Sequence, residues 1–179
     1  MKTLETERLE LTEFTEADAS DLYEYAKNPN VGPHAGWSPH KDREESLRII
    51  RELFMPNQTW AIRKKGDSRV IGSISLEPDR YRPDACSREL GYSLAEECWG
   101  QGIMTEAAKE VIRFGFEELG LDQIGICTGE ANRRSQRVIE KCGFKYEGTI
   151  RRTYKVYDGT LRDSMIFSML KEEYEEQYK

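Results

Sequence analysis

The 179-residue sequence has few of the side chains that build metal and disulfide sites, with four cysteines and two histidines. The cysteines form no C-x-x-C pair, and neither histidine lies three to five residues from the other. Zinc sites usually combine such pairs. We therefore expect no metal site, and reduced, mostly buried thiols at Cys86, Cys98, Cys127 and Cys142.

Long apolar runs and a positive net charge are also missing. No uninterrupted apolar run approaches the ~20 residues of a membrane span, and the first residues lack the apolar stretch of a signal peptide. The 27 basic residues against 33 acidic ones give a net charge of −6, which disfavours general binding to nucleic acid phosphates. We expect a cytoplasmic protein whose partners are neither membranes nor nucleic acids.

The composition that remains is that of a globular protein. At roughly 100–200 residues per domain, the chain should form a single domain over residues 1–179. Hydrophobic residues make up 37% and charged residues of both signs 34%, a balance that does not indicate disorder. A chain of this length can build a core without disulfides or metals.

The apolar pattern predicts alternating strands and helices. Thr15 and Asp18 resemble a capping box at a helix start, and Asp158-Gly159 is a hairpin signal. Helices are expected at 15–28, 42–54, 104–119 and 132–141, and a Gly- and Pro-rich loop at 29–40. Strands are expected at 8–14, 60–63, 69–77, 87–94, 123–128, 146–157 and 160–170.

This order predicts an α/β fold built on a mixed sheet. The strand at 87–94, the helix at 104–119 and the strand at 123–128 should form one right-handed parallel crossover. The other strands are expected to pair antiparallel, with helices on both faces of the sheet.

The loop between the strand at 87–94 and the helix at 104–119 contains Gly100 and Gly102. Glycine allows positive φ and a close approach of the backbone to a ligand, and a helix N-terminus attracts anions. Thr105 adds a hydroxyl to a possible pyrophosphate site, although a tight turn that binds nothing would contain the same glycines. The loop lacks the Gly-Lys-Ser/Thr end of a Walker A motif and the third glycine of a dinucleotide site.

Several short motifs in one order resemble the acetyl-CoA core of the GNAT superfamily of N-acetyltransferases. They are ELGYSL at 89–94, WGQGIMTEA at 99–107, NRRS at 132–135 and EKCGF at 140–144. The second motif, the start TERL at 6–9 and the end of the chain are similar to the RimJ/RimL-like branch, named for acetylation of ribosomal protein N-termini. Trp99 and Met104 depart from the superfamily's general loop pattern in ways that suit this branch.

The resemblance implies a GNAT fold, acetyl-CoA as co-substrate and an amine as acceptor. Backbone groups of Ser93 and Leu94 would pair with the pantetheine arm, and Asn132 would bond its amide region. The implied pyrophosphate loop is Trp99, Gly100, Gln101, Gly102, Ile103, Met104 and Thr105. The basic segment 133–141, which includes Arg137, either contacts CoA phosphates or is a solvated helix face.

Acetyl transfer to an amine requires a free amine, a stabilised carbonyl oxygen and a stabilised leaving thiolate. No cysteine lies near a histidine in sequence, so we expect direct attack in a ternary complex. Glu89 is the candidate base, although a strand carboxylate paired with Arg88 would have the same sequence. Ser135, which the resemblance places near the thioester sulfur, is the candidate acid. Tyr146 and Tyr154 are rivals for that role.

The sequence leaves the acceptor open among a protein N-terminus, a polyamine, an aminoglycoside and an amino acid. The loop around His34, Trp37 and His40 is either an acceptor-side wall or a plug over the core edge. The alternative functions are a catalytically inactive CoA-binding regulatory module and an interaction domain without a ligand. A homodimer is also consistent with the resemblance.

Overall fold

Strands and helices alternate along residues 1–178, which the computed structural model describes. The strands are β1 (Leu4–Glu5), β2 (Leu9–Glu13), β3 (Trp60–Lys64), β4 (Gly72–Pro78), β5 (Ser87–Leu94), β6 (Gln123–Thr128), β7 (Lys145–Lys155) and β8 (Leu161–Leu170). The α-helices are α1 (Ala19–Ala26), α2 (Gly32–Ala35), α3 (Arg43–Ile49), α4 (Ile103–Glu117), α5 (Arg133–Lys141) and α6 (Lys171–Tyr178). Short 3₁₀ turns are η1 (Glu16–Asp18) and η3 (Glu96–Cys98), and the π-helical segment η2 (Ile50–Phe54) extends α3.

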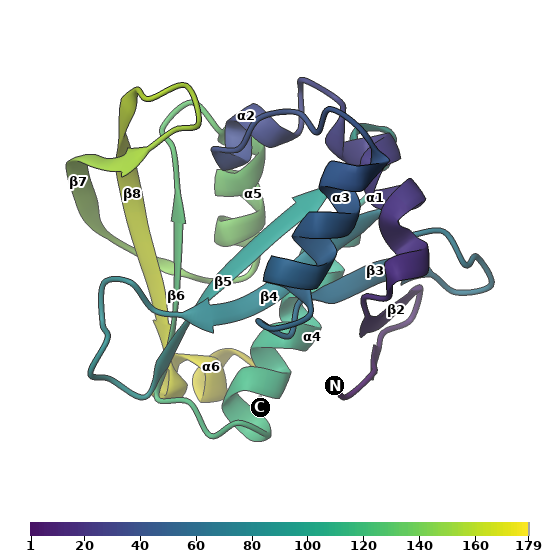
Figure 1. Cartoon of the computed structure of the whole chain (residues 1–179). Helices are drawn as coiled ribbons and strands as arrows, with labels where there is room; N and C mark the ends of the chain where they lie inside the picture. The colour runs from purple at the N-terminus through teal and green to yellow at the C-terminus, as the bar shows by residue number, and fades with distance from the viewer. Residues whose placement is uncertain (179) are drawn as a thin grey trace.

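All eight strands form one sheet in the order β1-β2-β3-β4-β5-β6-β8-β7 (Figure 1). Within residues 1–178 only β5 and β6 pair parallel, with α4 in the crossover between them, and every other neighbouring pair is antiparallel. The predicted mixed sheet with a single parallel crossover is therefore confirmed.

Helices cover both faces of the sheet. On one face Arg63 of β3 forms an ion pair with Asp18, beside α1, at 2.6 Å. On the other face the ring of Trp60 in β3 packs edge-on against Phe114 of α4, with 5.5 Å between centroids. We call the side of α1 and α3 the front face and the side of α4 and α5 the back face, as they appear in Figure 1.

The helix and strand predictions hold with a few differences. The Thr15–Asp18 capping box is present, but it begins η1, which then leads into α1. The strand predicted from 69 begins at Gly72, because the Val70 N–H bonds to the Asp21 carboxylate instead of joining the ladder. The predicted loop at 29–40 contains the single-turn helix α2, and β1 and α6 had no predicted counterpart.

The parallel pairing of β5 with β6 is short. It covers Ser87, Arg88 and Glu89 of β5 and ends where Glu89 lies opposite Gly125. Beyond this point β5 continues beside β4 and β6 continues beside β8, so the two strands diverge, as Figure 1 shows. Backbone groups of both strands that face each other beyond Glu89 have no strand partner, which leaves a slot in the middle of the sheet.

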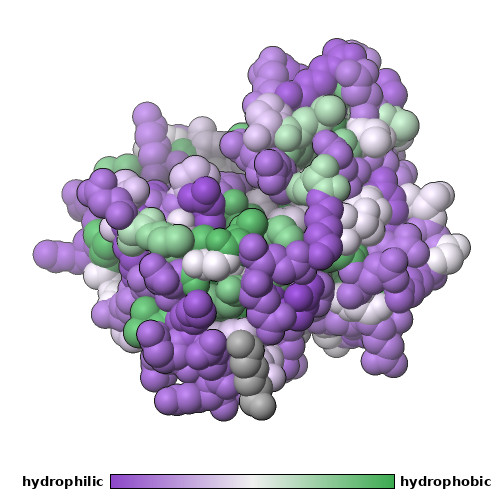
Figure 2. All heavy atoms as spheres, turned by 90° about the horizontal axis from the view of Figure 1, so that it is seen from below, coloured by the Kyte–Doolittle hydropathy of each residue, from purple (hydrophilic) through white to green (hydrophobic). Residues whose placement is uncertain are grey.

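Seen from below, hydrophilic residues cover most of the surface and hydrophobic ones gather in a smaller area between them (Figure 2). None of the helices within residues 1–178 has the length and apolarity of a membrane span. The four cysteines are free: Cys98 and Cys142 are buried, Cys127 is half-buried and Cys86 is exposed.

Candidate active site

A pocket of about 370 Å³ opens beside β5 where its pairing with β6 has ended. Its walls come from β5, the loop before α4, the first turn of α4, α5 and the region of α2. Most of the predicted ligand contacts line it, namely Ser93, Leu94, Trp99, Gly100, Gly102, Ile103, Met104, Thr105, Asn132, Ser135 and Arg137. Gln101 and Glu89 are not among its lining residues.

The glycine loop has the backbone that the sequence predicted. Gly100 has φ +73° and Gly102, which caps α4, has φ +76°. A side chain at Gly100 would meet nothing within 4 Å, and one at Gly102 would meet only Arg8, at 3.6 Å. The glycines therefore serve the turn itself, and they leave the N-terminal N–H groups of α4 open to an anion.

The loop is held from behind by the N-terminal TERL segment. Arg8 donates from Nε to Glu106 Oε2 at 2.6 Å and from Nη1 to the Gln101 carbonyl at 3.1 Å. Burial alone would raise the pKa of Glu106, but hydrogen bonds from Thr6 and Arg8 outweigh it and lower the pKa. Gln101 is thus placed outside the pocket, as a backbone anchor for the loop and not as a lining side chain. No sequence pattern predicted these contacts of Arg8, because 93 residues separate it from Gln101 and 98 from Glu106.

The charge of the pocket is entirely positive. Arg134, Arg137 and Lys141 line it, and none of the described residues that line it is acidic. Within residues 1–178 none of the three forms an ion pair, although Arg134 lies over the ring of Trp99, 4.3 Å from its centroid. Three unpaired cations beside a helix N-terminus, in a chain with a net charge of −6, fit a ligand that carries several negative charges.

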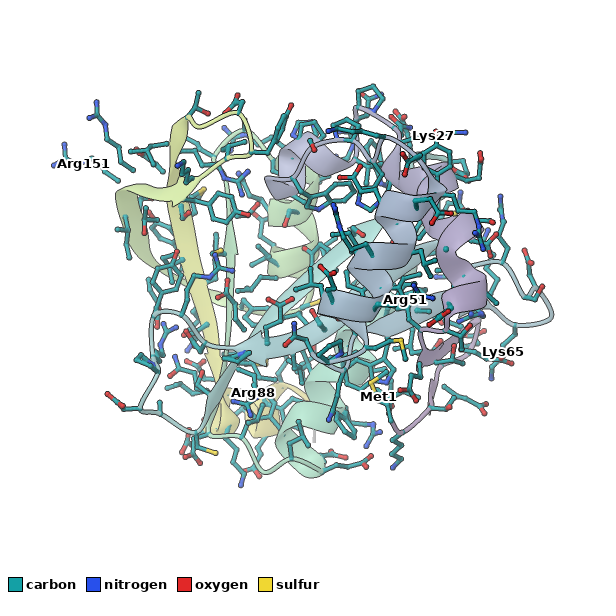
Figure 3. All side chains as sticks on the ribbon, viewed as in Figure 1. Met1, Lys27, Arg51, Lys65, Arg88 and Arg151 are labelled. Carbon is teal, nitrogen blue, oxygen red and sulfur yellow. The ribbon has the colours of Figure 1, made fainter. Side chains whose placement is uncertain are left out.

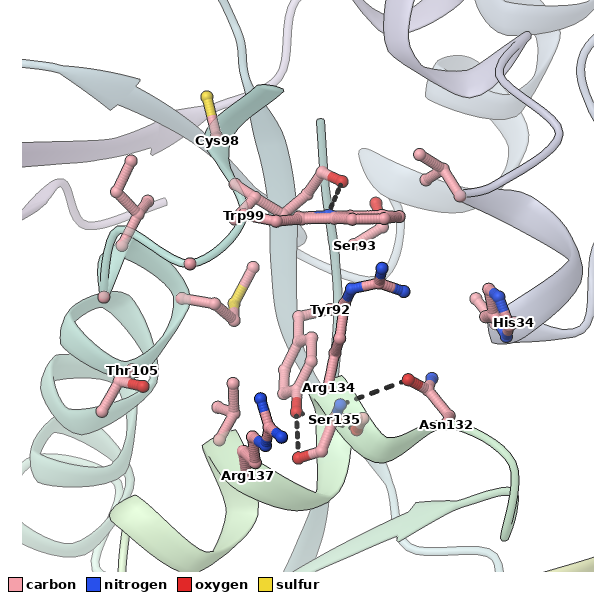
Figure 4. A pocket seen from close by; sticks show the side chains of 18 of the residues that line it. His34, Tyr92, Ser93, Cys98, Trp99, Thr105, Asn132, Arg134, Ser135 and Arg137 are labelled. Carbon is pink, nitrogen blue, oxygen red and sulfur yellow. Dashed lines mark hydrogen bonds between the residues drawn. The ribbon is translucent and has the colours of Figure 1, made fainter. Parts of the chain in front are cut away.

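Three side chains meet at the inner end of the pocket (Figure 4). The Asn132 Oδ1 accepts from the Ser135 N–H at 3.2 Å, which caps α5 and fixes the serine. The Tyr92 hydroxyl lies 3.0 Å from Ser135 Oγ, and desolvation raises the pKa of this tyrosine. The Tyr92 phenol is therefore neutral and holds a proton at the site. Tyr92 belongs to the ELGYSL motif, but nothing in the sequence indicated a role for its hydroxyl.

The ladder between β4 and β5 decides which backbone groups face the slot. Ala95 donates its N–H to Ile71 O, in register with the pair Ser73 and Ser93. Antiparallel ladders alternate, so the backbone of Ser93 points to β4, and those of Tyr92 and Leu94 point to the slot. The Leu94 carbonyl already accepts from Trp99 Nε1 at 2.9 Å. Ser93 therefore lines the pocket with its backbone in the β4–β5 ladder, and its predicted contact with a pantetheine arm stays a prediction.

Glu89 lies on the front face, at the fork where β5 and β6 part. It is 5% exposed, and its two oxygens accept from Arg80 Nε at 2.7 Å and from Cys127 Sγ at 3.1 Å. Its ionic partner is Arg80 and not the neighbouring Arg88. Burial and, after it, the adjacent Glu89 carboxylate raise the pKa of the Cys127 thiol to about 12. This cysteine therefore stays protonated as a hydrogen-bond donor.

The region of α2 closes the outer side of the pocket. His34 is exposed and lines the pocket, whereas His40 is held by Ser46 Oγ at 2.8 Å from its Nδ1. Trp37 packs against the His40 ring, 5.1 Å between centroids, and fills the space in front of Gly32. Trp37 thus acts as a plug.

The two tyrosines considered as rival acids lie elsewhere. Tyr146 is 55% exposed and bonds to Thr149, and Tyr154 bonds to the Ala35 carbonyl. Neither lines the pocket. No group of three or more His, Cys, Asp or Glu side chains in the described part of the chain is arranged to hold a metal ion.

Residues 8–145 match the family described as Acetyltransferase (GNAT) domain. The chain belongs to the GNAT acetyltransferase family. It is similar to the uncharacterized N-acetyltransferase p20 of Bacillus licheniformis, at 31% identity over 97% of this chain and 99% of that protein. It is also similar to the FsC-acetyl coenzyme A-N(2)-transacetylase of Aspergillus fumigatus, at 30% identity over 96% of this chain and 77% of that protein.

The fold is also that of solved acetyltransferases. The ribosomal-protein-S5-alanine acetyltransferase of Vibrio fischeri superposes with a TM-score of 0.77, covering 97% of this chain and 99% of that one at 21% identity. Likeness at this identity shows the GNAT fold alone. Membership of the family is therefore established, whereas the RimJ/RimL-like branch stays a prediction.

Proposed function

We propose that this protein transfers the acetyl group of acetyl-CoA to a primary amine by direct attack in a ternary complex. The observation that carries the proposal is the continuity of one pocket. It begins at a glycine loop with unpaired cations and runs along the free edge of β5 to the Tyr92–Ser135 pair. A charged end, an extended middle and a proton donor at the inner end match the phosphates, the pantetheine arm and the thioester of acetyl-CoA.

Each part of the pocket has a binding task in this proposal. The N–H groups at the start of α4, with Arg134 and Arg137, hold the phosphates. The slot-facing backbone of Tyr92 and Leu94 pairs with the pantetheine amides in the manner of an added strand. Asn132 bonds the same arm near the thioester.

The reaction forms a C–N bond to the amine and breaks the C–S bond of the thioester. The amine loses a proton, and we assign its uptake, through water, to Glu89 on the front face. The leaving sulfur gains a proton or a hydrogen bond, which Tyr92 supplies with Ser135 as its partner. A thiolate leaves readily, so hydrogen bonding can serve in place of complete proton transfer.

Three outcomes separate this proposal from its alternatives. The first measurement is release of free thiol from acetyl-CoA with a panel of amines, with mass spectrometry to detect the acetylated product. The second is thermal unfolding with and without CoA, because a ligand that binds only the folded state raises stability. An acetyltransferase is stabilised and releases thiol; an inactive CoA-binding module is only stabilised; an interaction domain does neither.

The names of the relatives support two acceptor classes. The Aspergillus protein is named for transfer to an N(2) nitrogen and the Vibrio protein for acetylation of a ribosomal protein. The transfer to nitrogen in the first name supports the general reaction, and the two names together leave the acceptor to be determined. We place the reaction in the cytoplasm, where acetyl-CoA and either class of amine are available.

A further inference from the structure

A second pocket, of about 580 Å³, adjoins the first on the acceptor side. It is enclosed by the region of α2, the loop between β6 and α5, and the β7–β8 hairpin. His34 and Asn132 line both pockets, so the two meet beside the inner end of the first. An acceptor that approaches the thioester from outside the acetyl-CoA pocket would pass through this space.

Arg162 is the most firmly held cation of the second pocket. Its guanidinium lies over the Tyr154 ring, 4.5 Å from the centroid, and its Nη1 donates to the His34 carbonyl at 2.9 Å. Its side chain also packs over Gly129, where an added Cβ would lie 3.5 Å from Arg162 Nε. An arginine fixed on three sides loses little conformational entropy when it binds a ligand.

The same arginine lacks an anionic partner. Its Nε is buried without a hydrogen-bond acceptor, and no ion pair joins Arg162 to any carboxylate within residues 1–178. Glu130 and Asp163 line the pocket, but Asp163 instead accepts from the Arg152 N–H at 2.8 Å. Buried unsatisfied donors are rare in folded proteins, and a guanidinium with no carboxylate partner of its own is suited to the carboxylate of a ligand.

The arginine also lies close to the proposed base. Arg80, which pairs with Glu89, and Arg162 both contact the Tyr154 ring, at 5.7 Å and 4.5 Å from its centroid. The charge of Arg162 further acts on the Cys127 thiol, which donates to Glu89. A ligand group on Arg162 would therefore lie near the place where the amine gives up its proton.

We propose that Arg162 binds a carboxylate of the acceptor, so that the acceptor is an amine that also carries a carboxylate, as amino acids do. This inference rests on the proposed function. Polyamines and aminoglycosides bring only positive charge toward Arg162 and are disfavoured by it. A pocket that contains Arg162 beside Glu130 and Asp163 presents both signs of charge, which matches a zwitterion.

The test compares each candidate acid with its own carboxamide and adds acceptors that carry no carboxylate. Thiol release is measured with glycine, β-alanine, 4-aminobutyrate and several L-α-amino acids, each beside its carboxamide, and with a short C-terminally amidated peptide without acidic side chains, spermidine and kanamycin. We expect at least one acid to exceed its amide by about 10- to 100-fold in kcat/KM, the scale of a hydrogen bond to a charged group. Amides, peptide or polyamines that react as well as every acid would overturn the inference and leave acetyl transfer intact.

The variant Arg162→Gln tests the residue itself. It should raise KM for the preferred acid by about 10- to 100-fold and leave the amide nearly unchanged, so the acid–amide difference disappears. Arg151→Gln is the matched control, because Arg151 lies on the same hairpin, is exposed and projects away from the molecule (Figure 3). Stabilisation by CoA should survive in both variants, which shows that the fold and the first pocket are intact. Equal acid preference in Arg162→Gln would refute the assignment.

Product binding keeps the inference testable if no amine reacts. Calorimetric titration of the CoA-loaded protein with N-acetyl amino acids and their amides measures carboxylate recognition without turnover. Binding of the acids that is lost in Arg162→Gln would support the carboxylate site while the proposed function fails. Absence of any acid preference would refute the site as well.

Discussion

The contact between Tyr92 and Ser135 predicts how substitutions of these two residues change both the free energy of unfolding and kcat. Their oxygens lie 3.0 Å apart, and the Tyr92 hydroxyl has only a longer contact, 3.4 Å, to the Ser135 carbonyl. Ser135→Ala and Tyr92→Phe should each cost about 1 kcal/mol, because each removes one partner of a hydrogen bond. The double variant should cost less than the sum, with a coupling energy of about 1 kcal/mol.

Such changes are measurable. For a chain of this size, 1 kcal/mol corresponds to about 2–4 °C in the midpoint of thermal unfolding. In thiol-release assays Tyr92→Phe should lower kcat by about 10²-fold, the low end for a lost proton donor, because a thiolate leaves readily. Ser135→Ala should cost less, since the phenol remains, and the double variant should resemble Tyr92→Phe. Unchanged kcat in Tyr92→Phe would remove the tyrosine from the mechanism, and additive stabilities would refute the hydrogen bond.

Four further predictions concern the loop, the base and the thiols. Gly102→Val places a branched residue at φ +76° and should weaken CoA binding at least about 10-fold; unchanged affinity in a folded variant would move the phosphate site. Glu89→Gln should reduce kcat by about 10²–10⁴-fold at low pH and by less as the amine deprotonates, and a wild-type pH–rate profile would assign the base elsewhere. Cys127→Ala should retain most of its turnover with sequential kinetics, because the Cys127 pKa near 12 keeps the thiol protonated; an acetyl-cysteine detected by mass spectrometry would contradict direct attack. Because the pKa of Glu106 is lower in the folded state, its carboxylate stabilises the fold at pH values above the pKa of the unfolded chain, and this stability is lost as the pH falls through the folded-state pKa. Glu106→Gln should remove that part of the pH dependence, measured as the free energy of unfolding across an acid titration.

The fold was predictable wherever a segment's own residues determine its structure. Local sequence signals predict these segments: apolar alternation in β2 and β5, the helical period of α4 and the Asp158-Gly159 turn. Each local conformation is kept in the folded protein. β1 and α6 lack such signals, because β1 has two residues and Tyr174 is the one buried residue of α6. These elements form through tertiary contacts, such as the stacking of Tyr174 on Phe116 of α4.

The site was predictable only in part, because several of its contacts join residues that are far apart in the sequence. The positive φ angles at Gly100 and Gly102 could be predicted because glycine favours them, and the family resemblance indicated Asn132 and Ser135 as site residues. The ionic partner of Glu89 could not be inferred, because Arg80 reaches it from a loop nine residues earlier, whereas Arg88 is adjacent in sequence. Nor could sequence alone bring Arg162 to His34, since 128 residues separate them.

The alternation of a single strand separates the two proton transfers that this chemistry requires. Tyr92 points to the back face and Ser135, whereas Glu89 points to the front face and Arg80. A donor and an acceptor in direct contact would exchange their proton with each other instead of with the substrates. Three residues of strand span about 10 Å, and odd spacing directs the two side chains to opposite faces. The slot between β5 and β6 begins at Glu89 and passes Tyr92, so a thioester within it would have the base at one end and the proton donor further along.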